Sequence, residues 1–127
     1  MVTVAVEVEA KAAITSPIIG FHVKDRLGQP LFGGNTYRTY EHSGLTIEPG
    51  EIFEARFRFQ MPTLIPGDYA ITAAIAEGSL EAHTQLQWLH DAALFRVTAS
   101  SLEGVLVGIP LQDIEIVQKL PFDEAAL

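Results

Sequence analysis

Apolar and polar residues alternate along much of this chain, and such alternation is typical of β-strands with one buried face. The clearest run is residues 53–59, where Phe, Ala, Phe and Phe alternate with Glu, Arg and Arg. Residues 2–9 show the same period, with valine at every second position. Because three of its four inward residues are phenylalanine, the 53–59 strand is predicted to supply much of the core.

Residues 19–24 also alternate and predict a third strand, which leads into a hairpin. The segment Asp25–Gly28 has the composition of a tight turn in which Gly28 adopts positive φ. Pro30 cannot donate to a ladder, so the return strand starts there or lies at a sheet edge. The run Gly33–Asn35 is predicted to bend the chain out of this short strand.

Residues 68–77 fit two patterns. Their alanines favour a helix by intrinsic propensity, whereas Tyr69, Ile71, Ala73 and Ile75 recur at the strand period. We predict a strand, because the neighbouring elements are strands as well. Those four side chains would then point inward, and the outward face would carry small residues at alternate positions: Ala70, Thr72, Ala74 and Ala76.

The rest of the chain adds further strands and one irregular region. Residues 36–46 are polar and predict a loop or irregular edge, whereas residues 83–89 and 93–99 predict two strands. Two last apolar runs follow at residues 105–110 and 114–117, before a tail, 119–127, that is either frayed or a single helical turn. Short strands separated by turns predict an all-β, antiparallel β-sandwich that forms one domain over residues 1–127.

Composition and charge exclude several classes of function. The 127 residues carry 16 acidic and 8 basic side chains, so the net charge is −8. This charge argues against nucleic acid as a partner and against binding to an anionic membrane. There is no cysteine, no apparent signal peptide, no apolar run that could span a membrane and no phosphate-binding glycine loop.

No sequence motif indicates catalysis or a metal site. The histidines at 83 and 90 are seven residues apart, so an unbroken strand would point them to opposite faces. We therefore expect no enzyme activity and no cofactor. A pair of carboxylates for sugar hydrolysis stays open as an alternative, because separation in sequence does not give separation in space.

The small-residue face of residues 68–77 is the main candidate for a binding surface. The next strand would place His83, Gln85 and Gln87 beside it. A flat floor edged by amides and an imidazole suits an extended glycan, but a second subunit or another protein segment would equally require small residues. For Trp88 we favour a core position on the face of Thr84 and Leu86 over a sugar-stacking role.

The polar segment that contains Tyr37 and Tyr40 is a second candidate. Loops of this composition often bind ligands. The alternative, tyrosines that lie against the rim of the sandwich, is slightly favoured.

The chain carries several linked motifs, at Pro17–Phe21, Lys24–Gly28 and Leu31–Thr36, followed by the less specific Pro66–Tyr69 and Trp88–Val97. Together they resemble the C-terminal domain of Wzt, the ATP-binding subunit of ABC transporters that export O-antigen polysaccharide. The resemblance covers most of the chain and implies an immunoglobulin-like fold. Because the phosphate-binding loop is absent, it also implies a C-terminal domain without its ATP-binding half.

By resemblance, the domain is a non-catalytic carbohydrate-binding module that recognises O-antigen polysaccharide in the cytoplasm. It would deliver the chain to an exporter made of an ATP-binding domain and a membrane subunit, so it would be peripheral to the inner membrane. This favours a glycan over a protein on the small-residue face. The predicted binding residues are Ala70, Thr72, Ala74, His83, Gln85, Gln87, Tyr37 and Tyr40.

Two alternatives of other classes stay open. One is a structural dimerisation or docking domain without a glycan site, and a weaker one is a surface-exposed adhesion module. We also expect a homodimer that exchanges the C-terminal strands 105–109 and 114–117, as the resemblance implies and as their apolar character favours.

Overall fold

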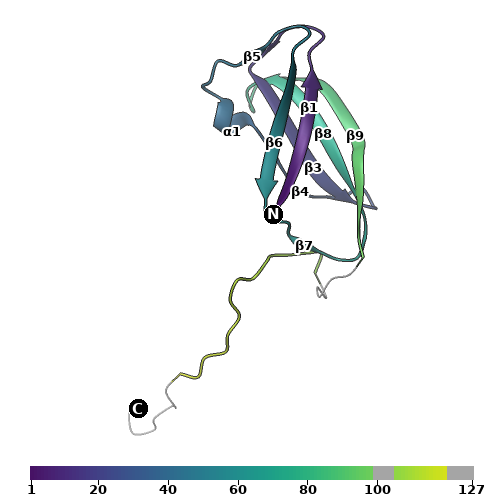
Figure 1. Cartoon of the computed structure of the whole chain (residues 1–127), viewed down its shortest axis with the longest axis vertical. Helices are drawn as coiled ribbons and strands as arrows, with labels where there is room; N and C mark the ends of the chain where they lie inside the picture. The colour runs from purple at the N-terminus through teal and green to yellow at the C-terminus, as the bar shows by residue number, and fades with distance from the viewer. Residues whose placement is uncertain (99–104, 120–127) are drawn as a thin grey trace.

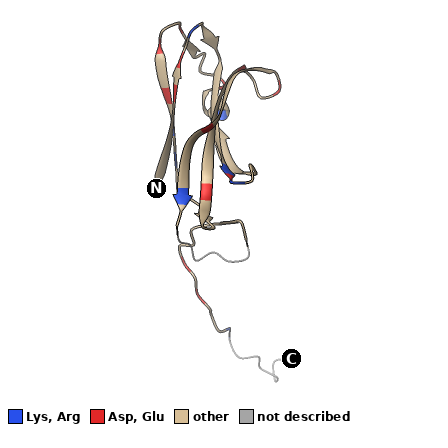
Figure 2. Cartoon of the chain, turned by 90° about the vertical axis from the view of Figure 1, so that its right-hand side faces the viewer, with Lys and Arg blue, Asp and Glu red and all other residues tan. Residues whose placement is uncertain are grey.

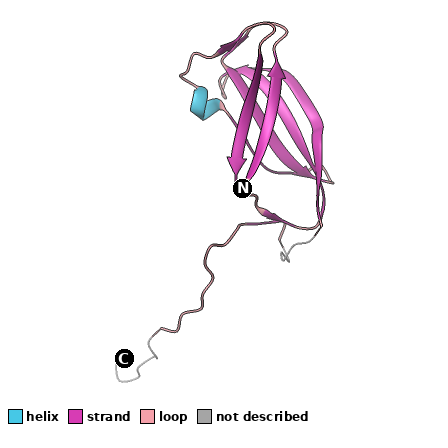
Figure 3. Ribbon diagram, viewed as in Figure 1, coloured by secondary structure: helices cyan, strands magenta, loops and turns pink. Residues whose placement is uncertain are grey.

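The computed structural model describes residues 1–98 and 105–119, and within them almost all regular structure is strand (Figure 3). All strand pairs are antiparallel. The elements in chain order are β1 (Val2–Glu9), β2 (Ile14–Thr15), β3 (Pro17–Asp25), β4 (Pro30–Asn35), α1 (Tyr37–Tyr40), β5 (Thr46–Ile47), β6 (Ile52–Phe59), β7 (Thr63–Leu64), β8 (Gly67–Gly78), β9 (His83–Val97) and β10 (Val107–Gly108).

Two layers make up the sandwich. A four-stranded sheet in the order β4-β3-β8-β9 forms one layer, and the pair β1-β6 lies across it (Figure 1). The two layers are seen from the side in Figure 2. Two short pairs, β2-β5 and β7-β10, lie near the ends. The predicted all-β, immunoglobulin-like antiparallel sandwich is confirmed.

The core lies between the layers and is rich in aromatic side chains. Phe21 of β3 is buried and stacks against two phenylalanines of β6, with ring centroids 4.9 Å from Phe57 and 5.8 Å from Phe59. Val23 and Tyr69 belong to the same buried cluster. The alternating phenylalanines of β6 therefore face the core, as predicted.

The predicted hairpin forms. Gly28 has φ of 81°, and its N–H donates to the Asp25 carbonyl at 3.0 Å. Strand β4 lies at a sheet edge, where the missing N–H of Pro30 is tolerated. The predicted bend at Gly33–Asn35 is wrong, because these residues continue β4. A side chain at Gly33 would collide with the Phe21 carbonyl and with His22, so the glycine permits close approach of the two strands.

Strand β8 forms despite its alanines. It pairs with β3 on one side and β9 on the other, and a helix would lose both sets of cross-strand hydrogen bonds. Tyr69 and Ile75 are buried toward the β1-β6 layer, as their period predicted.

The two strands predicted at 83–89 and 93–99 are in fact one long strand, β9. The register with β8 shifts twice. At the first shift, Ile75 and Ala76 pair with Gln87 and Gln85, so Leu86 is an extra residue in β9. At the second shift, Ile71 and Ala73 pair with Ala93 and Leu89, so β9 contains two further extra residues there. Within this second irregularity Asp91 has φ of 52°. These β-bulges change which side chains face each side of the sheet.

Two other predictions need correction. The loop predicted at 36–46 contains the helical turn α1 and the start of β5. The apolar run 114–117 is not a strand, and only Val107–Gly108 of the run 105–110 pairs with β7. Residues 109–119 extend away from the sandwich (Figure 1). The tail predicted at 119–127 lies outside the described residues from 120 onward.

Candidate functional site

The side of the four-stranded sheet that faces away from β1-β6 is called the outer face here. It is made of alternate residues of three strands, and the cross-strand register brings them together. Most side chains in its centre are small. Its members are Ile18, Gly20, His22 and Lys24 of β3, Ala70, Thr72, Ala74 and Ala76 of β8, and His83, Gln85, Trp88, His90 and Leu94 of β9.

One end of the outer face is hollowed into a cavity of about 210 Å³, which we call the indole cavity. Trp88 and Gln85 line it from β9, and Ala74 lies directly opposite Trp88 across the β8–β9 ladder. Thr72 lines it as well and is only 1% exposed. Among the described residues, the Thr72 hydroxyl has no hydrogen-bond partner. A buried hydroxyl without a partner costs free energy, which a new hydrogen bond to this atom would offset.

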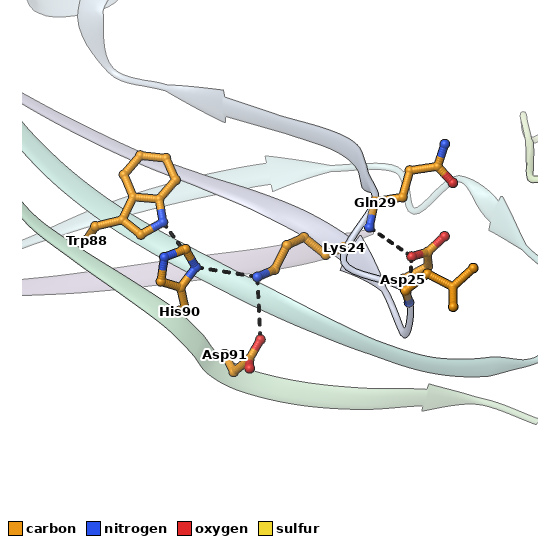
Figure 4. A network of polar contacts seen from close by, with 7 residues as sticks. Lys24, Asp25, Gln29, Trp88, His90 and Asp91 are labelled. Atoms are coloured by element: carbon orange, nitrogen blue, oxygen red, sulfur yellow. Dashed lines mark hydrogen bonds and ion pairs between the residues drawn. The ribbon is translucent and has the colours of Figure 1, made fainter.

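A polar network holds the Trp88 ring over this cavity (Figure 4). The indole N–H donates to His90 Nδ1 at 3.1 Å, and the Lys24 ammonium lies 3.5 Å from the same nitrogen. Lys24 is also 3.6 Å from Asp91 Oδ1. His90 Nδ1 therefore acts as an acceptor between two donors, and this fixes the rotation of the indole ring.

The His22 ring of β3 also contacts Trp88. Their ring centroids are 5.5 Å apart in an edge arrangement. Burial, and then the positive charge of Lys24 and the nearby His90, lower the pKa of His22 from its ordinary value. His22 is therefore neutral near pH 7 and offers one donor and one acceptor.

Five of the eight predicted site residues lie on the outer face. Ala70, Thr72 and Ala74 point outward as predicted, although Thr72 is buried beneath the larger side chains around it. His83 and Gln85 line the indole cavity beside them. The Gln85 amide donates to the Ile75 carbonyl at 2.9 Å, which orients it along the cavity wall.

The predicted placement of Gln87 is wrong, and so is the favoured core position of Trp88. The bulge at Leu86 inverts the alternation, so Gln87 lies on the opposite face of the sheet with Ile75. Trp88 takes the predicted place of Gln87 and is 43% exposed. The same bulge puts His83 and His90 on one face, contrary to the expectation for an unbroken strand. Nothing in the alternation of the sequence signals the extra residue.

Tyr37 and Tyr40 lie on α1, beyond Asn35, which itself lines the indole cavity. Desolvation, and then the carboxylates of Glu41 and Glu81, raise the pKa of Tyr37. Glu81 belongs to the turn between β8 and β9, next to Leu80 of the cavity lining. Because its carboxylate acts on Tyr37, α1 lies near this turn. Neither tyrosine lines the cavity.

The outer face offers hydrogen-bonding groups and an exposed aromatic ring, rather than a nucleophile with its base. Within residues 1–98 and 105–119, no group of three His, Asp or Glu side chains is placed to hold a metal ion. No helix in the same ranges is long and apolar enough to cross a membrane. The fold and this face define an all-β sandwich domain with a polar and aromatic surface hollow.

Comparison with known proteins identifies the family. The Wzt C-terminal domain family matches residues 1–109, so the chain belongs to that family, as its motifs predicted. A crystal structure of the C-terminal domain of Wzt is similar, with a TM-score of 0.73 and 19% identity over 91% of this chain and 69% of that one. At this identity the likeness shows the fold alone. No curated protein matches the chain.

Proposed function

We propose that this domain is a non-catalytic carbohydrate-binding module that recognises O-antigen polysaccharide and holds it in the indole cavity. The observation that carries the proposal is the buried, unpartnered hydroxyl of Thr72 on a floor of small side chains, beside the exposed ring of Trp88. A ligand hydroxyl that reached Thr72 would satisfy it and remove its desolvation cost.

The chemistry of the lining suits a sugar ring. One face of a pyranose is apolar and stacks on an aromatic side chain, and here the Trp88 indole stands at the edge of the cavity. Sugar hydroxyls need both donors and acceptors, which neutral His22, Gln85 and Thr72 supply. Gly20 and Ala74 have no side chain or only a methyl group, so a sugar ring can approach the backbone of the sheet there.

Family membership supports the setting of the proposal. In the proposed setting, the domain works in the cytoplasm as part of an O-antigen exporter, together with an ATP-binding domain and a membrane subunit. It is peripheral to the inner membrane through that transporter. The polysaccharide is its ligand and is not changed chemically.

The test is binding of the domain to O-polysaccharide from its own source and from unrelated serotypes, measured by calorimetry. Ala74→Arg puts a long side chain into the indole cavity and should abolish binding without a change in melting temperature. Ala5→Arg is the matched control for the indole cavity, because Ala5 is exposed on the other layer of the sandwich. Ala5 also lines a cavity between β1 and β9, so the oligomeric state of this variant is measured as well. If the wild-type domain binds no glycan, the proposal is wrong. If Ala74→Arg binds normally, the site lies elsewhere, with the α1 region as the next candidate.

Dimerisation is the second proposed function, and a separate observation favours it. The β1-β6 pair covers only part of the four-stranded sheet, which leaves an apolar groove between β1 and β9 with cavities of about 440 and 540 Å³. Residues 109–119 carry exposed apolar side chains, with Ile114 80% and Ile116 100% exposed. We propose that this segment of a second copy adds a strand in the groove.

Light scattering should give twice the chain mass of 13.8 kDa. The double substitution Ile114→Asp and Ile116→Asp should give a monomer, and Glu115→Gln between them should leave the dimer intact. Because both subunits are acidic, the dimer should tighten as salt rises. A wild-type monomer at high concentration would contradict strand exchange. A dimer that binds no glycan would instead support the structural role alone.

A further inference from the structure

The outer face holds a second and larger cavity, which the sequence did not indicate. Its volume is about 620 Å³, and we call it the charged cavity. It lies at the β3–β4 hairpin end of the sheet, where Ala70 forms the floor between Lys24 and Leu94. Most of the other lining side chains are ionised: Lys24, Asp25, Arg26, Asp68, Asp91 and Arg96.

The two cavities follow one another along β8. Thr72 and Ala74 belong to the indole cavity, and Ala70 and Asp68 belong to the charged cavity. The network that Figure 4 shows joins them, because Trp88 lines the indole cavity whereas Lys24 and Asp91 line the charged cavity. From Ala76 to Asp68 the strand extends for roughly 26 Å, at about 3.3 Å per residue. The outer face is therefore long enough for several units of an extended polymer.

The charges of this cavity are balanced, with three basic and three acidic side chains. Arg96 pairs with Asp68 at 2.6 Å, and Lys24 pairs with Asp91. Among the described residues, Arg26 forms no ion pair. An anionic ligand would be repelled by the three carboxylates, and a cationic ligand would be repelled by the three basic side chains. An uncharged ligand rich in hydroxyls would find both donors and acceptors.

An apolar contact is also available in the charged cavity. Leu94 is 76% exposed although it sits on a regular part of β9 opposite Ala70. Leu94 and Ala70 together form a small apolar surface surrounded by charged groups. This combination suits a sugar ring, which has apolar C–H groups on its face and hydroxyls at its rim.

We propose that the charged cavity is a second subsite, which takes an uncharged, hydroxyl-rich sugar residue of the same glycan whose other part occupies the indole cavity. This inference rests on the proposed carbohydrate-binding function. It adds that the domain reads more than one sugar residue. Affinity should therefore rise with chain length until both cavities are filled.

The experiment compares three alanine-to-glutamine variants, which add the same neutral bulk at three places. Ala70→Gln obstructs the charged cavity, Ala74→Gln obstructs the indole cavity, and Ala5→Gln is the control on the other layer. The probes are O-polysaccharide from the source of the protein and short oligosaccharides made from it by partial hydrolysis. Ala70→Gln should weaken polysaccharide binding at least about tenfold but leave the shortest oligosaccharide that binds unaffected. Ala74→Gln should weaken both, and Ala5→Gln neither.

The outcomes separate the two proposals. Wild-type protein that binds neither probe overturns the proposed function and this inference with it. If the wild-type protein binds polysaccharide, Ala74→Gln abolishes that binding and Ala70→Gln leaves it unchanged, only the second subsite is overturned. If Ala70→Gln weakens the binding of polysaccharide and short oligosaccharide equally, the second subsite is also overturned, because a single site would explain both losses. Should Ala70→Gln fail to fold, Arg26→Gln is the substitute, since Arg26 forms no ion pair among the described residues.

Salt dependence tests the chemical class of the sugar. An uncharged residue in this cavity predicts that polysaccharide affinity changes less than about twofold between roughly 0.1 and 1 M salt, where screening of charges becomes much stronger. A fall of about tenfold or more over that range would show that an ionised group of the glycan is recognised, and would overturn the uncharged class.

Discussion

The two faces of strand β8 differ in whether their buried hydroxyl groups have hydrogen-bond partners. On the inner face, Tyr69 and Ile75 are buried in apolar clusters, and the Tyr69 hydroxyl donates to the Ile65 carbonyl. On the outer face, Thr72 is equally buried but its hydroxyl has no partner among the described residues. One strand therefore stabilises the fold with one set of side chains and leaves a polar group unsatisfied with the other.

This difference separates stability from binding. Large side chains on the inner face meet a complementary layer, so their removal leaves a cavity. Among the described residues no layer covers the outer face, and its aromatic ring is held by a hydrogen bond to His90 and an edge contact with His22 rather than by core packing. Substitutions on the two faces should thus have different effects, and each of the following predictions tests that difference.

The largest effect is expected on the inner face. Phe21→Ala removes a buried ring that contacts Phe57 and Phe59, and should lower the free energy of unfolding by about 3–5 kcal/mol. Urea denaturation followed by circular dichroism measures this change. A loss below about 1 kcal/mol would show that the inner face is not the main source of stability.

A smaller effect of the opposite sign is expected at Thr72. Thr72→Val replaces the unpartnered hydroxyl with a methyl group of similar size, so the free energy of unfolding should rise by about 1–2 kcal/mol. Glycan affinity should fall at the same time, because the ligand loses its partner. Thr3→Val, at an exposed position of β1, is the control and should change stability by less than about 0.5 kcal/mol. A Thr72→Val variant that is less stable than wild type would mean that the hydroxyl is satisfied in the protein.

Trp88→Ala provides the direct comparison with Phe21→Ala. The indole is 43% exposed, so its loss should lower the free energy of unfolding by only about 1 kcal/mol. Glycan binding should nevertheless be lost, because the stacking surface is gone. Calorimetry and urea denaturation on the same samples check both parts. Destabilisation as large as that of Phe21→Ala would restore the core role that the sequence favoured.

The smallest effect is a pH dependence that comes from His22. Burial, Lys24 and His90 lower its pKa below 6.5 in the folded protein, so the unfolded chain binds the proton first as pH falls. This group leaves stability unchanged above about pH 6.5 and reduces it below that value, down to the folded pKa. His22→Gln should therefore show a shallower loss of stability between about pH 7 and 5. An identical slope in both proteins would assign the acid sensitivity to other groups.

Most of the fold could be predicted from local pattern. The strand period is visible in residues 2–9, 19–24 and 53–59, because half-buried strands need apolar side chains at every second position. The turn at Gly28 was equally predictable, since positive φ selects glycine. The motifs of residues 17–36 were sufficient to predict the family, and that prediction is confirmed.

The arrangement of the site depended on tertiary structure. Alternation assigns faces correctly only while a strand is regular, and β9 contains extra residues at Leu86 and around Asp91. A bulge arises from pairing with a partner strand, so a single sequence carries no periodic signal for it. For this reason Ala70, Thr72 and Ala74 were placed correctly on β8, whereas Gln87 and Trp88 exchanged faces.

The sequence by itself determined that this chain forms an all-β sandwich with a small-residue face, since that information lies in local periodicity and residue size. Only the tertiary structure decided which side chains surround that face. Lys24 is 66 residues from His90 in the chain, yet it lies 3.5 Å from that ring because β3 and β9 are both neighbours of β8. Contacts of this kind depend on register across three strands, and register is set by the packing of the whole sheet.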